Sequence, residues 1–123
     1  MNEQPSLPDR RTVLIGKAIS ATVAHAPWLW PVISGPVMRF FDKAAGSWDS
    51  RTGAGSVEHL APLAAAVLAI EREPERILDV GCGTGAATLF LAREFPRARV
   101  RGVDISAVMI NRASAKIGLD PEA

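Results

Sequence analysis

The sequence contains few of the residues on which redox and metal chemistry depend. Its 123 residues include one cysteine, Cys82, two histidines and no tyrosine. A single cysteine excludes an intrachain disulfide and a multi-cysteine zinc site, and no phenol is present to serve as an acid or base. We therefore expect no metal site, and a cytoplasmic location fits this cysteine content.

An excess of one charge is also missing. Lys and Arg number 14 against 13 Asp and Glu, so the formal net charge is +1. This balance gives no electrostatic reason to expect a nucleic-acid partner. The hydrophobic content of 48% is enough for a packed core and too high for a disordered chain. At this length the chain forms one domain at most.

Long apolar runs are absent even from the most apolar segment, residues 9–26, DRRTVLIGKAISATVAHA. Its arginine pair, apolar stretch and small-residue end give a rough secretory or twin-arginine pattern. Lys17 interrupts the stretch, which is too short for a span of about 20 apolar residues. We predict a helix over 12–25 that packs on the domain or contacts a membrane peripherally, and a signal sequence is the alternative. Its apolar side comprises Val13, Leu14, Ala18, Ala21 and Thr22 or Val23.

The chain divides into three segments. Residues 1–35 hold a loose tail over 1–10, the apolar helix and a stretch that prolines break. Residues 36–73 hold a helical lid that starts at Pro36 and ends near Gly46, a turn-rich connector over 49–55, and a helix that Ser56 caps. Residues 74–123 form a partial α/β domain.

The order of elements after Ser56 predicts the fold class. We expect two strands, over 76–80 and 99–104, that alternate with helices. The first strand is a short apolar run that fits burial on both faces of a sheet. Ser106 is expected to cap the last helix. This order is typical of a right-handed parallel crossover in a Rossmann-like, doubly wound α/β sheet. Two parallel strands do not make a stable sheet. We therefore expect an incomplete fold with a helical N-terminal extension, and a fragment of a longer protein.

A glycine-rich loop, LDVGCGTGAA over 78–87, follows the first strand. Gly81, Gly83 and Gly85 let a ligand lie on bare backbone before a helix N-terminus, which is a ligand position in open α/β sheets. The loop also satisfies the dinucleotide pattern G-x-G-x-x-A, and Asp104 lies at a suitable distance for a ribose acid. Spacing alone therefore leaves dinucleotide binding open.

Asp79 distinguishes between the two ligand classes. A dinucleotide places an anionic pyrophosphate against the helix N-terminus, where a neighbouring carboxylate repels it by roughly 4 kcal/mol at 4 Å and an effective dielectric of 20. Asp79 suits a ligand with a cationic end instead. S-adenosyl-L-methionine has no phosphate and carries a sulfonium and an ammonium group.

Residues 77–106 resemble the cofactor-binding part of class I S-adenosylmethionine-dependent methyltransferases. The first motif of that family is an acid followed by alternating glycines, and its second is an acid that ends the next strand, which here is Asp104. The resemblance is sharp over 75–118 and weaker over 40–74. It implies methyl transfer to a small molecule.

The resemblance also implies roles for individual residues. The glycine loop, with Cys82 as a small space-filling residue, contacts the methionine part of the cofactor, and Asp79 binds its ammonium. Asp104 accepts both ribose hydroxyls, Ile105 lies against the adenine, and Met109 comes near it.

The resemblance implies two further cofactor contacts, both from residues of the lid. Trp48 covers the sulfonium by a cation–π contact, and Arg51 reaches the cofactor carboxylate. We nominate no catalytic residue, because the acceptor site of the family lies further downstream. The tryptophan-bearing N-terminus hints at a lipid-like or quinone-like acceptor. An NAD(P)- or FAD-binding oxidoreductase and a non-catalytic cofactor-binding module are the alternatives.

Overall fold

The computed structural model describes residues 10–119. The loose tail predicted over 1–10 lies outside this range, apart from Arg10, which begins the first helix. The helices are α1 Arg10–His25, α2 Trp30–Ala44, α3 Trp48–Thr52, α4 Val57–Leu68, α5 Ala86–Glu94 and α6 Ala107–Gly118, with short 3-10 helices at Pro27–Leu29 and Ala45–Ser47. The strands are β1 Arg76–Val80 and β2 Arg99–Val103.

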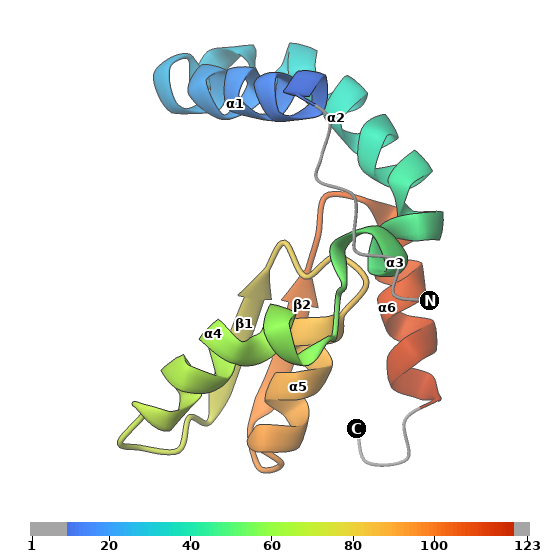
Figure 1. The fold of residues 1–123 in the computed structure, drawn as a ribbon. Helices are drawn as coiled ribbons and strands as arrows, with labels where there is room; N and C mark the ends of the chain where they lie inside the picture. Colours follow the sequence, from blue (N-terminus) through green and yellow to red (C-terminus); the bar gives the residue numbers. More distant parts are fainter. Residues whose placement is uncertain (1–9, 120–123) are drawn as a thin grey trace.

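The two strands form a parallel pair, as the sequence predicts, with Asp79 opposite Gly102. Helices and strands alternate in the order α4, β1, α5, β2, α6, which confirms the expected incomplete Rossmann-like class (Figure 1). Beyond β1, the amides of Gly81 and Cys82 both donate to the carbonyl of Val103, at 2.8 and 3.0 Å. The glycine loop therefore begins as a continuation of the strand pairing.

One face of β1 is open. Helix α5 packs against both strands on the other face, but the side chains of Leu78 and Val80 are 61% and 75% exposed. The prediction that β1 is buried on both faces is therefore wrong for the described residues. Its physical reason is that no element within 10–119 covers the side on which these two residues lie.

Pro27, Pro31 and Pro36 lie within helices, so the predicted start of the second helix at Pro36 is wrong. Helix α2 begins at Trp30 and runs across the expected segment boundary at 35/36. Pro27 and Pro31 occupy the first turns of their helices, where a missing amide hydrogen removes no intrahelical bond. Only Pro36 lies in the helix interior.

Helix α1 includes the whole of the helix predicted over 12–25, but its predicted apolar side is largely exposed. It lies across the carboxyl ends of the strands (Figure 1). Val13 and Leu14 on its expected apolar side are 40% and 65% exposed, because no described element packs on them. Within the described residues, no helix is long and apolar enough to cross a membrane.

The predicted connector over 49–55 is helical in its first half. Residues 49–52 belong to α3, and only the end of the connector is a turn, with Gly53 and Gly55 at φ +65° and +86°. The predicted cap of the next helix is confirmed, since the hydroxyl of Ser56 accepts a hydrogen bond from the amide of His59 at 3.2 Å.

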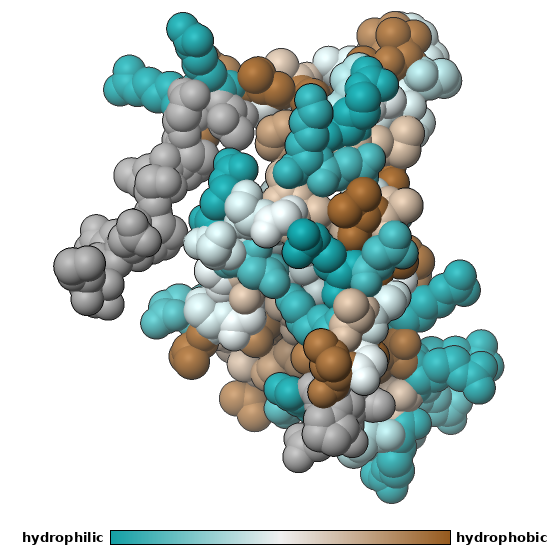
Figure 2. All heavy atoms as spheres, turned by 90° about the vertical axis from the view of Figure 1, so that its right-hand side faces the viewer, coloured by the Kyte–Doolittle hydropathy of each residue, from teal (hydrophilic) through white to brown (hydrophobic). Residues whose placement is uncertain are grey.

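The predicted cap of α6 is confirmed as well. The buried hydroxyl of Ser106 accepts from the amide of Met109 at 3.1 Å and donates to Asp42 of α2 at 2.6 Å. One serine thus both starts α6 and attaches it to α2. On the face drawn in Figure 2, hydrophilic and hydrophobic side chains are interspersed.

Gly85 is required by the packing of the loop against α6. Its φ is +85°, and a Cβ at this position would lie 2.8 Å from the Cβ of Ala113. We predict that Gly85→Ala lowers the free energy of unfolding of the complete protein by about 2–4 kcal/mol, through backbone strain and overpacking.

Gly118→Ala is the matched control, because a Cβ there meets nothing within 4 Å. It should change stability by about 0.5 kcal/mol or less. Urea denaturation of both variants measures the difference, and equal stabilities would contradict the proposed contact.

Candidate functional site

A cavity of about 910 Å³ lies at the carboxyl ends of the strands, below α1 and beside α2 and α3. The residues of the glycine loop and the second acid meet there, as their places in the sequence predict. Predicted residues that line it are Asp79, Gly81, Cys82, Gly83 and Asp104. Ile105, Met109 and Trp48 line it as well.

The first two glycines present bare backbone to this cavity. Gly81 and Gly83 have φ values of +75° and +54°, which residues other than glycine adopt only at a cost in free energy. A Cβ on Gly81 would meet no atom within 4 Å, and one on Gly83 would lie 3.7 Å from Nε1 of Trp48. A ligand can therefore approach the loop closely at Gly81.

Asp104 fixes the shape of the loop. Its Oδ2 accepts the amide of Gly83 at 2.8 Å, and its Oδ1 accepts the amide of Ser106 at 2.9 Å. The carboxylate thus joins the glycine loop to the N-terminus of α6. Since an ionised carboxylate has about four acceptor positions, each oxygen retains capacity for one ligand hydroxyl.

Asp79 is held from the helix that follows the loop. The hydroxyl of Thr88, a buried residue of α5, donates to its Oδ2 at 2.6 Å. The carboxylate is therefore oriented by a side chain of α5, and Asp79 lines the cavity.

Cys82 is packed against the second strand. A Cβ on Gly102 would lie 2.9 Å from its Sγ, so the absence of a side chain at position 102 makes room for the thiol. Burial raises the pKa of Cys82, and the negative charges of Asp79 and Asp104 raise it further. A thiol with a raised pKa is a poor nucleophile, which agrees with a space-filling residue.

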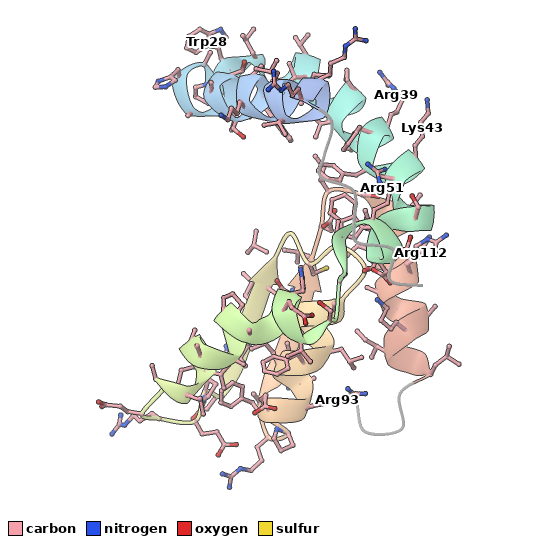
Figure 3. The ribbon with its side chains drawn as sticks, viewed as in Figure 1. Trp28, Arg39, Lys43, Arg51, Arg93 and Arg112 are labelled. Atoms are coloured by element: carbon pink, nitrogen blue, oxygen red, sulfur yellow. The ribbon has the colours of Figure 1, made fainter. Side chains whose placement is uncertain are left out.

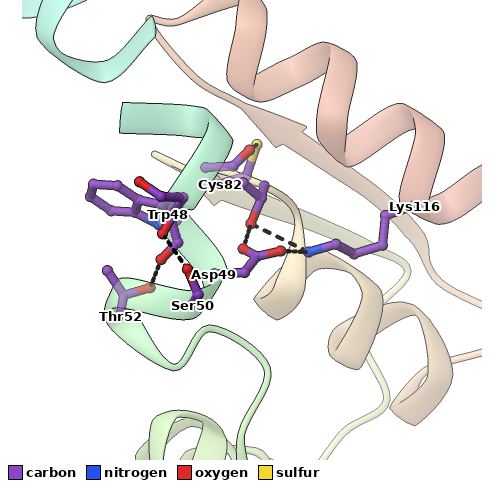
Figure 4. Close-up of polar contacts among 9 residues, drawn as sticks. Trp48, Asp49, Ser50, Thr52, Cys82 and Lys116 are labelled. Carbon is purple, nitrogen blue, oxygen red and sulfur yellow. Dashed lines mark hydrogen bonds and ion pairs between the residues drawn. The ribbon is translucent and has the colours of Figure 1, made fainter. Parts of the chain in front are cut away.

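Helix α3 is attached to the glycine loop by polar contacts that the sequence analysis missed (Figure 4). The hydroxyl of Thr84 donates to Oδ1 of Asp49, and Lys116 of α6 donates to its Oδ2 at 2.9 Å. Burial would raise the pKa of Asp49, but the hydrogen bonds from Lys116 and Thr84 outweigh it and lower the pKa. Three separate elements therefore meet at one carboxylate.

This attachment places Trp48 at the cavity. Its ring lies edge-on to Phe41 of α2, with centroids 5.7 Å apart. The tryptophan therefore packs on α2 through one part of its ring and borders the glycine loop with its Nε1.

Two predicted contacts do not reach the cavity. Gly85 packs on Ala113 instead, and Arg51 is exposed on α3 and is not among the lining residues (Figure 3). The sequence analysis also missed the opposite wall, to which α1 and α2 contribute. Of the residues on the predicted apolar side of α1, only Val23, named there as an alternative to Thr22, lines the cavity. The wall comprises Ile19, Val23, Trp30, Val37 and Phe41.

In a comparison with known proteins, residues 77–122 match the model of a family described as "Methyltransferase domain". Trans-aconitate 2-methyltransferase of Pseudomonas paraeruginosa is 58% identical over 41 residues, which are 33% of this chain and 15% of that protein. The enzyme of the same name from Streptomyces avermitilis is 38% identical over 79 residues, 61% of this chain and 29% of that protein.

A relative with a different acceptor in its name also matches. The tRNA1(Val) (adenine(37)-N6)-methyltransferase of Porphyromonas gingivalis is 33% identical over 76 residues, 62% of this chain and 24% of that protein. The chain spans less than a third of the length of each of these three relatives. The family match over residues 77–122 includes the glycine loop from Gly81 onward and the second acid, Asp104.

The attachment at Asp49 makes a testable contribution to stability. We predict that Asp49→Asn destabilises the complete protein by about 1 kcal/mol at neutral pH, because the side chain is 45% exposed and solvent screens its ion pair with Lys116. The folded-state pKa is lowered, so the stabilisation is present above the ordinary value of 3.8. It is lost as the pH falls through the lower folded-state pKa.

Denaturant titrations of both proteins between pH 3 and pH 7 measure this difference. Glu73→Gln removes the fully exposed ion pair with Arg97 and should have a smaller effect. A constant difference between Asp49→Asn and the unchanged protein across the titration would rule out the charged contact as its cause.

Proposed function

We propose, from the premise that this chain contains part of a class I methyltransferase domain, that the protein transfers a methyl group from S-adenosyl-L-methionine to a small-molecule acceptor. The observation that carries the proposal is the meeting of two acids and a bare glycine loop in one cavity. Asp79 and Asp104 line this cavity together with Gly81 and Gly83.

The donor groups of the cavity fit this cofactor. Asp79 carries a negative charge beside the loop and suits the ammonium or the sulfonium. Asp104 retains acceptor capacity on both oxygens for the two ribose hydroxyls. Ile105 and the buried Met109 supply apolar surface for an adenine ring.

The chemistry needs little from the protein beyond alignment. The cofactor supplies an already activated methyl group when bound, and the chain's own residues orient it and exclude water. Trp48 is placed at the cavity wall, where its ring face suits a sulfonium. Arg51 has no comparable support, since it lies outside the lining.

The acceptor is proposed only as a small molecule. Two of the relatives described above are named for trans-aconitate, and a third is named for a tRNA adenine. A cytoplasmic location belongs to the same proposal. The lipid-like or quinone-like hint rested on both N-terminal tryptophans, but of these only Trp30 lines the cavity.

An oxidoreductase that binds NAD(P) or FAD is the alternative, and Asp79 separates the two functions. Asp79→Asn removes the charge and keeps an oxygen that can accept from Thr88. For a methyltransferase we expect the affinity for S-adenosylmethionine to fall by about tenfold or more, which is about 1.4 kcal/mol. For an oxidoreductase the same change removes a repulsion, so NAD affinity would rise.

Calorimetric titration of the complete protein with each cofactor gives the answer. Glu94→Gln serves as control, because this exposed residue lies at the end of α5, away from the cavity lining. It should leave both affinities unchanged. Binding of NAD but not of S-adenosylmethionine to the unchanged protein would refute the methyltransferase proposal.

A further inference from the structure

The cavity has two chemically different sides. The sheet side carries the glycine loop and the acids Asp79 and Asp104. The helix side is formed by apolar side chains of α1 and α2, on segments with no motif of the cofactor site. Its larger side chains are Ile19, Val23, Trp30, Val37 and Phe41.

The helix side is joined into one surface by packing. Val37 is buried, while Phe41 contacts both Phe40 and Trp48 edge-on, with centroids 5.3 and 5.7 Å apart. Trp48 therefore links the apolar wall to the glycine loop. A molecule that lies against this wall can reach the position that Trp48 borders.

Positive charge is missing from the lining. Among the described residues, the ionisable groups that line the cavity are Asp79, Asp104, His59 and Cys82, and neither lysine nor arginine contributes. Arg39 and Lys43 project from α2 on its outer side (Figure 3). A polyanionic acceptor would therefore find a cation only in the proposed cofactor, whose charge Asp79 already offsets, which is unfavourable in a partly enclosed site.

We propose that the helix side of the cavity binds the methyl acceptor, and that this acceptor is an uncharged molecule with an apolar body. The inference rests on the proposed function, because it takes the sheet side as the cofactor site. It separates this protein by acceptor class from relatives that are named for trans-aconitate, a tricarboxylate, and for tRNA, a polyanion.

The transfer step follows from this arrangement. An acceptor oxygen, nitrogen or carbon uses an electron pair to form a bond to the methyl carbon, while the bond from that carbon to sulfur breaks and its electrons neutralise the sulfonium. S-adenosylhomocysteine leaves, and any proton that the acceptor atom carried passes to water. The helix wall contributes by holding the apolar body of the acceptor in line with the cofactor.

Helix α1 offers a matched pair of positions for the test. Val23 lines the cavity and is 41% exposed, while Val13 lies on the same helix, is 40% exposed and does not line it. Both positions are accessible enough for a lysine to be accommodated at the surface. Val23→Lys therefore places a cation on the wall, and Val13→Lys places the same cation elsewhere on α1.

The experiment measures binding of 1-naphthol and of trans-aconitate to the complete protein in the presence of saturating S-adenosylhomocysteine. The proposal expects 1-naphthol to bind more tightly than trans-aconitate. It expects Val23→Lys to lower the affinity for 1-naphthol by at least about fivefold, because apolar contact with the wall is lost. Val13→Lys should leave its affinity unchanged, and this control should not alter the affinity for S-adenosylmethionine.

Equal effects of the two lysine variants, or tighter binding of trans-aconitate by the unchanged protein, would overturn this inference. If 1-naphthol does not bind while S-adenosylmethionine binds normally, the inference about the acceptor is overturned and the proposed function is unaffected. If the unchanged protein does not bind S-adenosylmethionine, the proposed function fails first.

Discussion

The candidate site depends on one carboxylate, that of Asp104, at the end of β2. It accepts the amides of Gly83 and Ser106, so it fixes the glycine loop to the start of α6 across 21 residues of sequence. A glycine loop has a high conformational entropy before folding, and ordering it costs free energy that a ligand would otherwise have to supply. Charge-assisted hydrogen bonds to backbone amides are strong enough to hold such a loop in one shape. The backbone that faces the cavity is therefore preorganised before any ligand arrives.

The same residues also connect the loop to the helical lid. Ser106 donates its amide to Asp104 and its hydroxyl to Asp42 of α2, while Thr84 of the loop donates to Asp49 of α3. These contacts run from the strand ends to α2 and α3, two of the helices that border the cavity. A displacement of the loop is thus opposed by side chains on the sheet side and on the lid side. We infer that cofactor affinity and the position of Trp48 are coupled through this network.

Local signals in the sequence were sufficient for the strands, for the caps at Ser56 and Ser106, and for the acids of the site. Each depends on neighbours within a few residues: a short β-branched run, a hydroxyl three residues before an amide, an acid at a strand end. The errors lie where distant residues decide. Prolines suggested a break over 26–36, but Pro31 fits the first turn of α2. No pattern in the sequence indicated that the missing side chain of Gly85 makes room for Ala113 of α6, while the predicted cofactor contact of Gly85 stays a prediction. The Asp49 contacts join residues 35 and 67 positions apart, and no periodicity reports such pairs.

The orientation of α1 shows why composition alone misleads about an acceptor site. The most apolar residues of this helix, including Leu14 and Ile15, are 65% and 60% exposed, and they do not line the cavity. The side that does so carries Ile19, Ser20, Val23 and Ala24, three apolar residues and one serine. For the acceptor site that we propose, the side of α1 that borders the cavity therefore matters more than the composition of the whole helix. Helix α1 is connected to α2 through the short 3-10 helix Pro27–Leu29, so the proposal of an uncharged acceptor rests on how this connection turns α1 toward the cavity.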